Sequence, residues 1–166
     1  HAVASLFISR WSSRSFTCET IPDAVLFSSI DAARWAPSAA NAQPWRFIYA
    51  KRDSADWSRF LGLVFENNAV WAKNASALVL LVSRTQRQGE KGLIPHHSHS
   101  FDTGAAWENF ALQASQLGWS TRAIGGFDRE KAKQELEIPD GFAIEVLIAI
   151  GKPADNAALP PELQAG

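Results

Sequence analysis

The feature that most constrains the fold is an unbroken apolar run at residues 77–82, Ala-Leu-Val-Leu-Leu-Val. Successive side chains of an extended strand point to opposite faces, so this run places apolar groups on both faces. A strand of that kind has to be covered on both sides, which predicts a buried central strand. Residues 144–150 are predicted as another buried strand of the same sheet.

Helical and extended patterns alternate irregularly along the rest of the chain. We predict helices over residues 2–10, 20–35, 57–64, 67–76, 102–117 and 128–136, and further strands over 47–50 and 120–124. Thr20 and Asp102 are the predicted N-caps of the second and fifth helices, because short polar side chains accept bonds from free helical N–H groups. Without a strict βαβ alternation, an α+β layered domain over residues 1–166 is favoured.

Charge and cysteine content narrow the classes of function. The 166 residues include 16 basic and 17 acidic side chains, which argues against broad binding to nucleic acid or membrane surfaces. A single cysteine, Cys18, excludes an intramolecular disulfide and fits a reducing compartment. No apolar run reaches the roughly 18 residues that a membrane span needs. These observations predict a cytoplasmic protein.

Two prolines stiffen a polar segment between the second helix and the strand at 47–50. Pro37 and Pro44 restrict their own φ angles and push the preceding residues away from helix. Between them, Ser38, Asn41 and Gln43 are spaced by alanines, which add little bulk. Such a segment can hold hydrogen-bonding groups against a flat ligand, or it can be an ordinary helix-to-strand loop.

A second polar pattern follows the first helix, where Arg10, Ser12 and Arg14 alternate. In extended chain this spacing points all three side chains to one side. Two guanidinium groups and a hydroxyl make a good anion site. The alternative is a pair of solvated cations near a helix C-terminus.

Residues 84–100 are predicted as an irregular polar surface loop. Its histidines, His96, His97 and His99, lack metal-ligand spacing and a partner carboxylate or cysteine, so a solvated loop is favoured over a metal site. Gly125 and Gly126 follow a strand, which permits either a close backbone approach to a ligand or an ordinary turn. No dinucleotide, triphosphate or acyl-transfer motif is found in the sequence.

Five segments taken together resemble the nitroreductase family of small FMN-dependent flavoproteins. They are R-W-S-S-R-S-F at 10–16, A-P-S-A-A-N-A-Q-P-W at 36–45, F-D-T-G-A-A-W-E-N-F-A-L-Q-A at 101–114, I-G-G-F-D at 124–128 and I-A-I-G-K-P at 148–153. They occur in the family's order over nearly the whole chain. The resemblance implies a central mixed, mainly antiparallel sheet flanked by helices, and a homodimer with FMN at the interface.

The resemblance also implies which residues bind the cofactor. One subunit would contribute Arg10, Trp11, Ser12 and Arg14 to the phosphate, ribityl chain and pyrimidine edge. Its partner would line the flavin with Pro37, Ser38, Ala39, Asn41 and Gln43. Asn68 would contact the polar edge of the ring, and Ile124, Gly125 and Gly126 would bring a backbone N–H near N5. No catalytic side chain and no metal are implied, because the flavin carries the chemistry.

The implied activity is transfer of a hydride from NAD(P)H through flavin N5 to a nitroaromatic, quinone or similar conjugated acceptor. Dehalogenation or flavin cleavage on the same fold, and a non-catalytic flavin-binding or redox-sensing dimer, are the alternatives. Two departures from the family pattern bear on the choice between the implied activity and its alternatives. Arg122 stands where relatives often have histidine. The basic phosphate contact that the family takes from a C-terminal segment has no match here, so either the end of the chain is trimmed or FMN binds more weakly.

Overall fold

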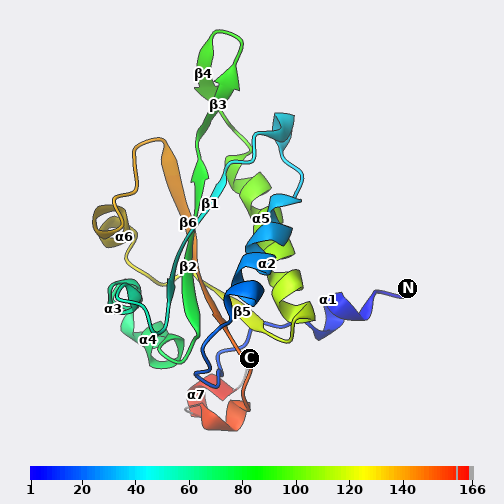
Figure 1. Ribbon diagram of the computed structural model, residues 1–166, viewed down its shortest axis with the longest axis vertical. Coiled ribbons are helices and arrows are strands. Elements are labelled where there is room, and N and C mark those ends of the chain that lie inside the picture. The colour runs from blue at the N-terminus through cyan, green and yellow to red at the C-terminus, as the bar shows by residue number, and fades with distance from the viewer. Residues whose placement is uncertain (160, 165–166) are drawn as a thin grey trace.

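A four-stranded sheet forms the centre of the computed structural model, which describes residues 1–159 and 161–164 (Figure 1). The strand order is β1-β2-β6-β5. The strands are β1 (Trp45–Lys51), β2 (Ala77–Arg84), β5 (Ser120–Ile124) and β6 (Phe142–Gly151). The apolar run at 77–82 thus lies in β2, with a partner strand on each side, as its pattern predicts.

Every pairing in this sheet is antiparallel among the described residues, so the expected mixed sheet is wrong. The connections explain the difference. Lys51 pairs with Ala77, so the chain between β1 and β2 leaves and returns at the same end of the sheet. Ile124 pairs with Leu147, and β5 and β6 are therefore joined at one end as well. Such returns produce antiparallel neighbours.

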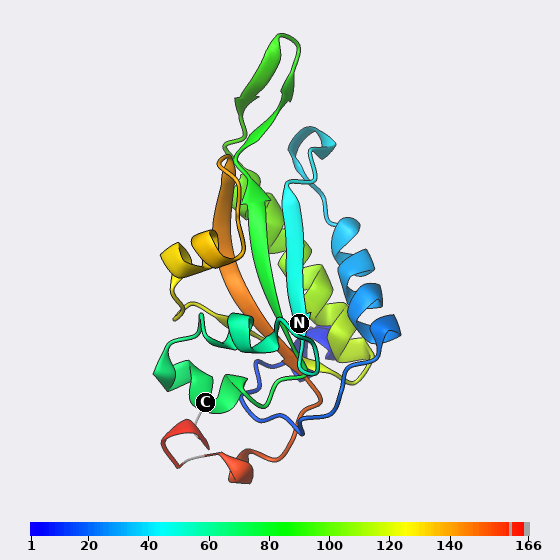
Figure 2. The ribbon, with the colours of Figure 1, turned by 60° about the vertical axis from the view of Figure 1, so that its left-hand side comes forward.

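Helices cover both faces of the sheet (Figures 1 and 2). On one face, α2 (Asp23–Arg34) and α5 (His99–Gln116) pack against Val79 and Leu81 of β2. The other face is covered by α3 (Trp57–Leu61), α4 (Glu66–Ala72) and α6 (Arg129–Glu135), which form an apolar cluster with Leu78 and Leu80 of β2. Alternate side chains of β2 therefore enter two separate apolar clusters, which is the arrangement that its composition requires.

The segment at 84–100 differs from the predicted irregular loop. It forms a hairpin of β3 (Gln86–Gly89) and β4 (Gly92–Pro95) that projects beyond the sheet (Figure 2). The remaining short elements are α1 (Ser5–Ser9), η1 (Ala39–Asn41), η2 (Asn156–Ala158) and α7 (Pro161–Gln164). Within the described parts of the chain, no helix combines the length and apolar character needed to cross a membrane.

Both predicted helix caps are wrong. Pro22 occupies the N-cap position of α2, while the Thr20 hydroxyl donates to Asp53 Oδ2 at 2.7 Å. The helix α5 begins three residues earlier than predicted, with Ser98 at its N-cap. Asp102 is therefore inside the first turn of α5, and its side chain is free to bond elsewhere.

A glycine near the end of β6 is required by close packing. A Cβ atom on Gly151 would lie 2.6 Å from Cδ1 of Phe16, whose ring belongs to the apolar cluster beneath α4. We expect Gly151→Ala to lower the free energy of unfolding by about 1–3 kcal/mol through overpacking. Urea unfolding measures this change. In the background Phe16→Leu the added cost of Gly151→Ala should shrink, and an equal cost in both backgrounds would contradict the proposed clash.

Candidate functional site

The segment after α1 is fixed across the sheet edge formed by β5. Ser120 Oγ donates to the carbonyl of Trp11 at 3.2 Å, and the guanidinium of Arg122 donates to the carbonyl of Ser12. The segment then pairs with the end of the sheet, where Phe16 forms a bridge to Pro153. The predicted phosphate-binding residues are thereby held on a rigid support next to Arg122.

Three arginines give this region a strong positive charge. Arg10 Nε is 3.9 Å from Glu108 Oε1, a long contact with a half-exposed carboxylate. Neither Arg14 nor Arg122 has a carboxylate within 4.0 Å among the described residues. Partial burial, with a further contribution from the neighbouring Arg14 charge, lowers the pKa of Arg122. Two adjacent cations without a counter-ion are the electrostatic signature of an anion site.

A chain of contacts links these cations to the glycine pair. The guanidinium carbon of Arg122 is 5.8 Å from the ring centroid of Trp71, a side chain only 1% exposed. Trp71 Nε1 donates to Asn68 Oδ1 at 3.3 Å, and Asn68 Nδ2 donates to the carbonyl of Gly126 at 3.3 Å. The structure therefore brings residues 10–14, Asn68 and 124–126 together on one side of the molecule.

The two glycines play different parts in this arrangement. A Cβ atom on Gly126 would lie 2.6 Å from Asn68 Nδ2, so any side chain at this position would require that amide to move. A Cβ atom on Gly125 would meet no atom within 4 Å. Ile124, the preceding residue, is buried with 2% exposure and anchors the turn. The exposed backbone of Gly125 is consequently open to a ligand.

The proline-framed loop lies elsewhere. It packs at the first turn of α5, where the amide of Ala39 donates to Asp102 Oδ2 at 3.0 Å, whereas α1 and β5 lie toward the other end of that helix (Figure 1). α5 has 18 residues and is therefore about 27 Å long. One chain does not bring Pro37, Ser38, Ala39, Asn41 and Gln43 together with the other predicted residues.

The histidines near this loop differ from their predicted solvated state. His96 is buried with 2% exposure and its Nε2 lies 3.1 Å from Asp102 Oδ2. His99 Nδ1 lies 2.7 Å from Ser83 Oγ and 3.4 Å from Glu145 Oε1. Only His97 is exposed. Among the described residues, no group of histidine, cysteine and carboxylate side chains has the arrangement of a metal site.

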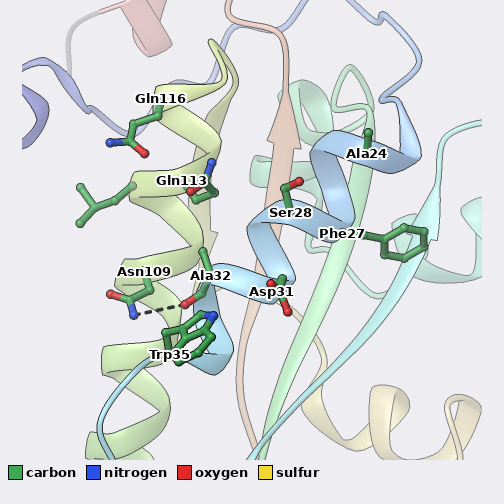
Figure 3. Close-up of a pocket in the computed structure, with 10 residues that line it drawn as sticks. Ala24, Phe27, Ser28, Asp31, Ala32, Trp35, Asn109, Gln113 and Gln116 are labelled. Carbon is green, nitrogen blue, oxygen red and sulfur yellow. Dashed lines mark hydrogen bonds between the residues drawn. The ribbon is translucent and has the colours of Figure 1, made fainter.

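A broad groove of about 860 Å³ runs between α2 and α5, where Asn109 Nδ2 donates to the carbonyl of Ala32 at 3.3 Å (Figure 3). None of the predicted cofactor-binding residues lines it. A second hollow of about 550 Å³ is lined in part by Asn41 and Gln43, together with Arg34 and Arg46. The loop amides thus face open space at the surface.

Comparison with known proteins decides the family. The model of the nitroreductase family matches this chain over residues 8–86 and 63–152. The chain belongs to the nitroreductase family. This membership makes it an oxidoreductase, and it confirms the family resemblance that the five sequence segments indicate.

Individual proteins that are similar to this chain support the same family assignment. A protein of Streptomyces coelicolor provisionally named NADH dehydrogenase/NAD(P)H nitroreductase is 30% identical, over 95% of this chain and 86% of its own. One from Archaeoglobus fulgidus with the same provisional name is 29% identical, over 91% and 85%. A crystal structure described as an oxidoreductase containing FMN has a TM-score of 0.96 and 45% identity, covering 99% of this chain and 83% of that one.

Three residues of the candidate site are not predicted from the sequence as parts of it. From the sequence, Arg122 is noted only as a departure from the family pattern and Asp102 only as a helix N-cap, and Trp71 is assigned no part in binding. Arg122 and the buried Ile124 are two residues apart in β5, and this spacing places both side chains on the same face of an extended strand. The contact between Ala39 and Asp102 joins residues 63 positions apart and has no local signal.

Proposed function

We propose that this protein is an FMN-dependent NAD(P)H oxidoreductase that reduces a nitroaromatic, quinone or similar conjugated acceptor. The observation that carries the proposal is the cation pair Arg14 and Arg122, which has no carboxylate within 4.0 Å in the described part of the chain and is connected through Trp71 and Asn68 to an open glycine backbone. The 45% identical structure described as containing FMN and the relatives named as NAD(P)H nitroreductases support it.

The residues present fit FMN in charge and in shape. Arg10, Ser12 and Arg14, with Trp11 beside them, suit a phosphate and the polar ribityl chain, because guanidinium forks pair well with phosphate oxygens. Asn68 offers an amide to the polar ring edge, next to the open backbone at Gly125. On the loop, Asn41 and Gln43 are exposed and join each other by a bond of 2.9 Å, so their amides are prearranged for a flat ligand.

A homodimer is part of the proposal, because one chain holds the two halves of the site apart. In a symmetric pair related by a two-fold axis, the same surface of each subunit meets its copy. An axis crossing the outward face of α5 would set the loop of one subunit against the arginines of the other. That face is prepared for contact: Phe101 is 81% exposed and Gly104 has open space around it.

FMN, when bound, supplies the redox chemistry by accepting a hydride and passing it to the acceptor. The chain's own residues then have electrostatic and steric tasks. The fixed charges of Arg14 and Arg122 stabilise negative charge that develops at the polar edge of the ring. The bare backbone at Gly125 lets a planar ligand approach closely. No acid or base from the protein is required.

The test is uptake and reduction of FMN. The purified protein, mixed with FMN and dialysed, should retain one yellow flavin per chain, measured from its visible absorbance. Anaerobic addition of NADPH or NADH should bleach that absorbance, and a nitroaromatic or quinone should restore it. A protein that retains no FMN, or a bound flavin that neither nucleotide bleaches, would contradict the proposed function.

A further inference from the structure

We propose that Asp102 is a positioning residue whose buried carboxylate shapes the loop at 38–43 for contact with FMN. The inference rests on the proposed function for the identity of the ligand. Its structural part, control of the loop by Asp102, stands on contacts that do not involve the cofactor. The residue lies in α5 and touches none of the arginines at the other half of the site, so its effect on FMN is exerted through the loop.

The contacts converge on one oxygen atom. Asp102 Oδ2 accepts from the amide of Ala39 at 3.0 Å and from the hydroxyl of Ser98 at 3.2 Å, and it lies 3.1 Å from His96 Nε2. Asp102 is 4% exposed and His96 2% exposed. A carboxylate removed from water is stable only where several donors replace its hydration; Ala39 and Ser98 donate here, and His96 donates as well in the tautomer protonated at Nε2.

The loop has a conformation that needs such an anchor. Ala40, Asn41 and Gln43 all have positive φ, at 53°, 50° and 45°. Asparagine tolerates this region, but Ala40 and Gln43 are held in a conformation that their side chains disfavour. Within the loop, the amide of Gln43 donates to Ser38 Oγ at 3.0 Å. The bond from Ala39 to Asp102 ties this folded unit to α5 and sets where its exposed amides point.

His96 gives the anchor a rigid backing. Its own amide donates to the carbonyl of Thr85 at 2.9 Å, and the amide of Thr85 donates to the carbonyl of Gly141 at 2.8 Å. His96 Nδ1 is buried without a hydrogen-bond partner among the described residues, and the polar contacts of the ring with Asp102 and Ser98 are made by Nε2. The base of the hairpin, the start of α5 and the loop are therefore joined at one buried acid–imidazole pair.

The first experiment measures hydrogen exchange of the amides in the loop at 38–43. We expect Asp102→Ala to accelerate hydrogen exchange of amides in residues 38–43 of the flavin-free protein by about tenfold or more, because the anchoring bond is lost. His99→Ala is the matched control. It lies at the start of the same helix, where its Nδ1 bonds to Ser83 Oγ and faces Glu145; its ring lies 6.5 Å from that of His96, centroid to centroid, but makes no bond to Asp102, so exchange in the loop should be unchanged. Unchanged exchange in Asp102→Ala would overturn the inference.

The second experiment measures FMN affinity by flavin fluorescence quenching. We expect Asp102→Ala to raise Kd about tenfold or more, and Asp102→Asn to raise it less, since the amide oxygen still accepts from Ala39. Thermal unfolding of each flavin-free variant distinguishes a specific loss of FMN affinity from a loss of overall stability. Should Asp102→Ala fail to fold, Asp102→Leu, which keeps the side-chain volume but offers no acceptor to Ala39, serves in its place, and a Kd within twofold of wild type for that variant overturns the inference.

A double-mutant cycle distinguishes positioning from a general structural effect. The losses from Asp102→Ala and Asn41→Ala should be less than additive, because both remove what the same loop contributes. The losses from Asp102→Ala and Arg14→Ala should add, since Arg14 belongs to the other half of the site. Additivity in both cycles would overturn the positioning role. If wild type takes up no FMN while exchange in the loop still rises, the proposed function fails and the control of the loop by Asp102 stands.

Discussion

Replacing Trp71 with alanine is expected to lower the free energy of unfolding by about 3–5 kcal/mol. Trp71 is 1% exposed and is the largest of the fully buried side chains, in the cluster between the sheet and α4. Its ring lies 6.4 Å from that of Phe16, and its removal leaves a cavity between rigid elements. Urea-induced unfolding of the flavin-free protein, followed by circular dichroism, measures the change.

Trp71→Phe is the matched control. Phenylalanine retains most of the apolar volume but loses the Nε1 donor that bonds to Asn68. We expect its cost to be much smaller, about 1 kcal/mol for the lost hydrogen bond plus a modest packing term. If alanine and phenylalanine were equally damaging, the indole N–H rather than the buried volume would be the stabilising feature, contrary to this prediction.

The core of the fold could be predicted because it depends on local patterns. The run at 77–82 identifies β2, the strand predicted at 120–124 has the same bounds in the structure, and those predicted at 47–50 and 144–150 have slightly wider bounds there. The Asp128 N-cap illustrates the same locality, since its side chain accepts from the amide of Lys131, three residues away. Interactions of this range can be predicted from the sequence because both partners lie within a few residues of each other.

Strand direction and buried polar contacts depend on distant residues and could not be read in this way. Residues 84–100 look like a loop because they are polar and contain Gly89 and Gly92, yet these glycines turn a hairpin. His96 appears solvated among polar neighbours until Asp102 and the loop enclose it. The sequence therefore predicts most of the helices and strands but not the partners of buried charges.

The candidate site shows the same division. The resemblance of short motifs supplies the residue types at 10–14, 37–43, 68 and 124–126, because cofactor contacts are concentrated in those motifs. Which of these segments meet within one chain is a question of topology. Arg122 and Trp71, which connect Ser12 to Asn68, become visible only when β5 and α4 are placed next to each other. The separation of the loop from the arginines is likewise evident only in the structure.

That separation leads to the prediction with the largest effect on binding. Gly104→Arg is expected to convert the proposed dimer into monomers and to weaken FMN binding by on the order of a hundredfold, about 2.8 kcal/mol. Gly104 lies on the outward face of α5, three residues after the exposed Phe101, and nothing surrounds a Cβ atom placed there. A long cation at this position would prevent close approach of a second α5 and would bring two like charges together across the axis.

The monomer itself should not suffer, which makes the result diagnostic. Arginine favours helix over glycine by up to about 1 kcal/mol, so thermal unfolding of the flavin-free variant at equal concentration should show an intact fold. Ser58→Arg, an exposed position on α3 across the sheet, provides the same charge and bulk away from the proposed interface. Light scattering should report a mass near 18.2 kDa for Gly104→Arg and twice that for wild type and for Ser58→Arg.

The two measurements together test whether one FMN needs two chains. Loss of the dimer with loss of FMN is expected, because the loop amides and the arginines then no longer meet. A monomeric Gly104→Arg that kept wild-type affinity would show that residues 10–14, 68 and 124–126 suffice, and that the loop serves another purpose. A variant that remained dimeric would move the interface away from the outward face of α5, and the exposed Phe101 would need a different explanation.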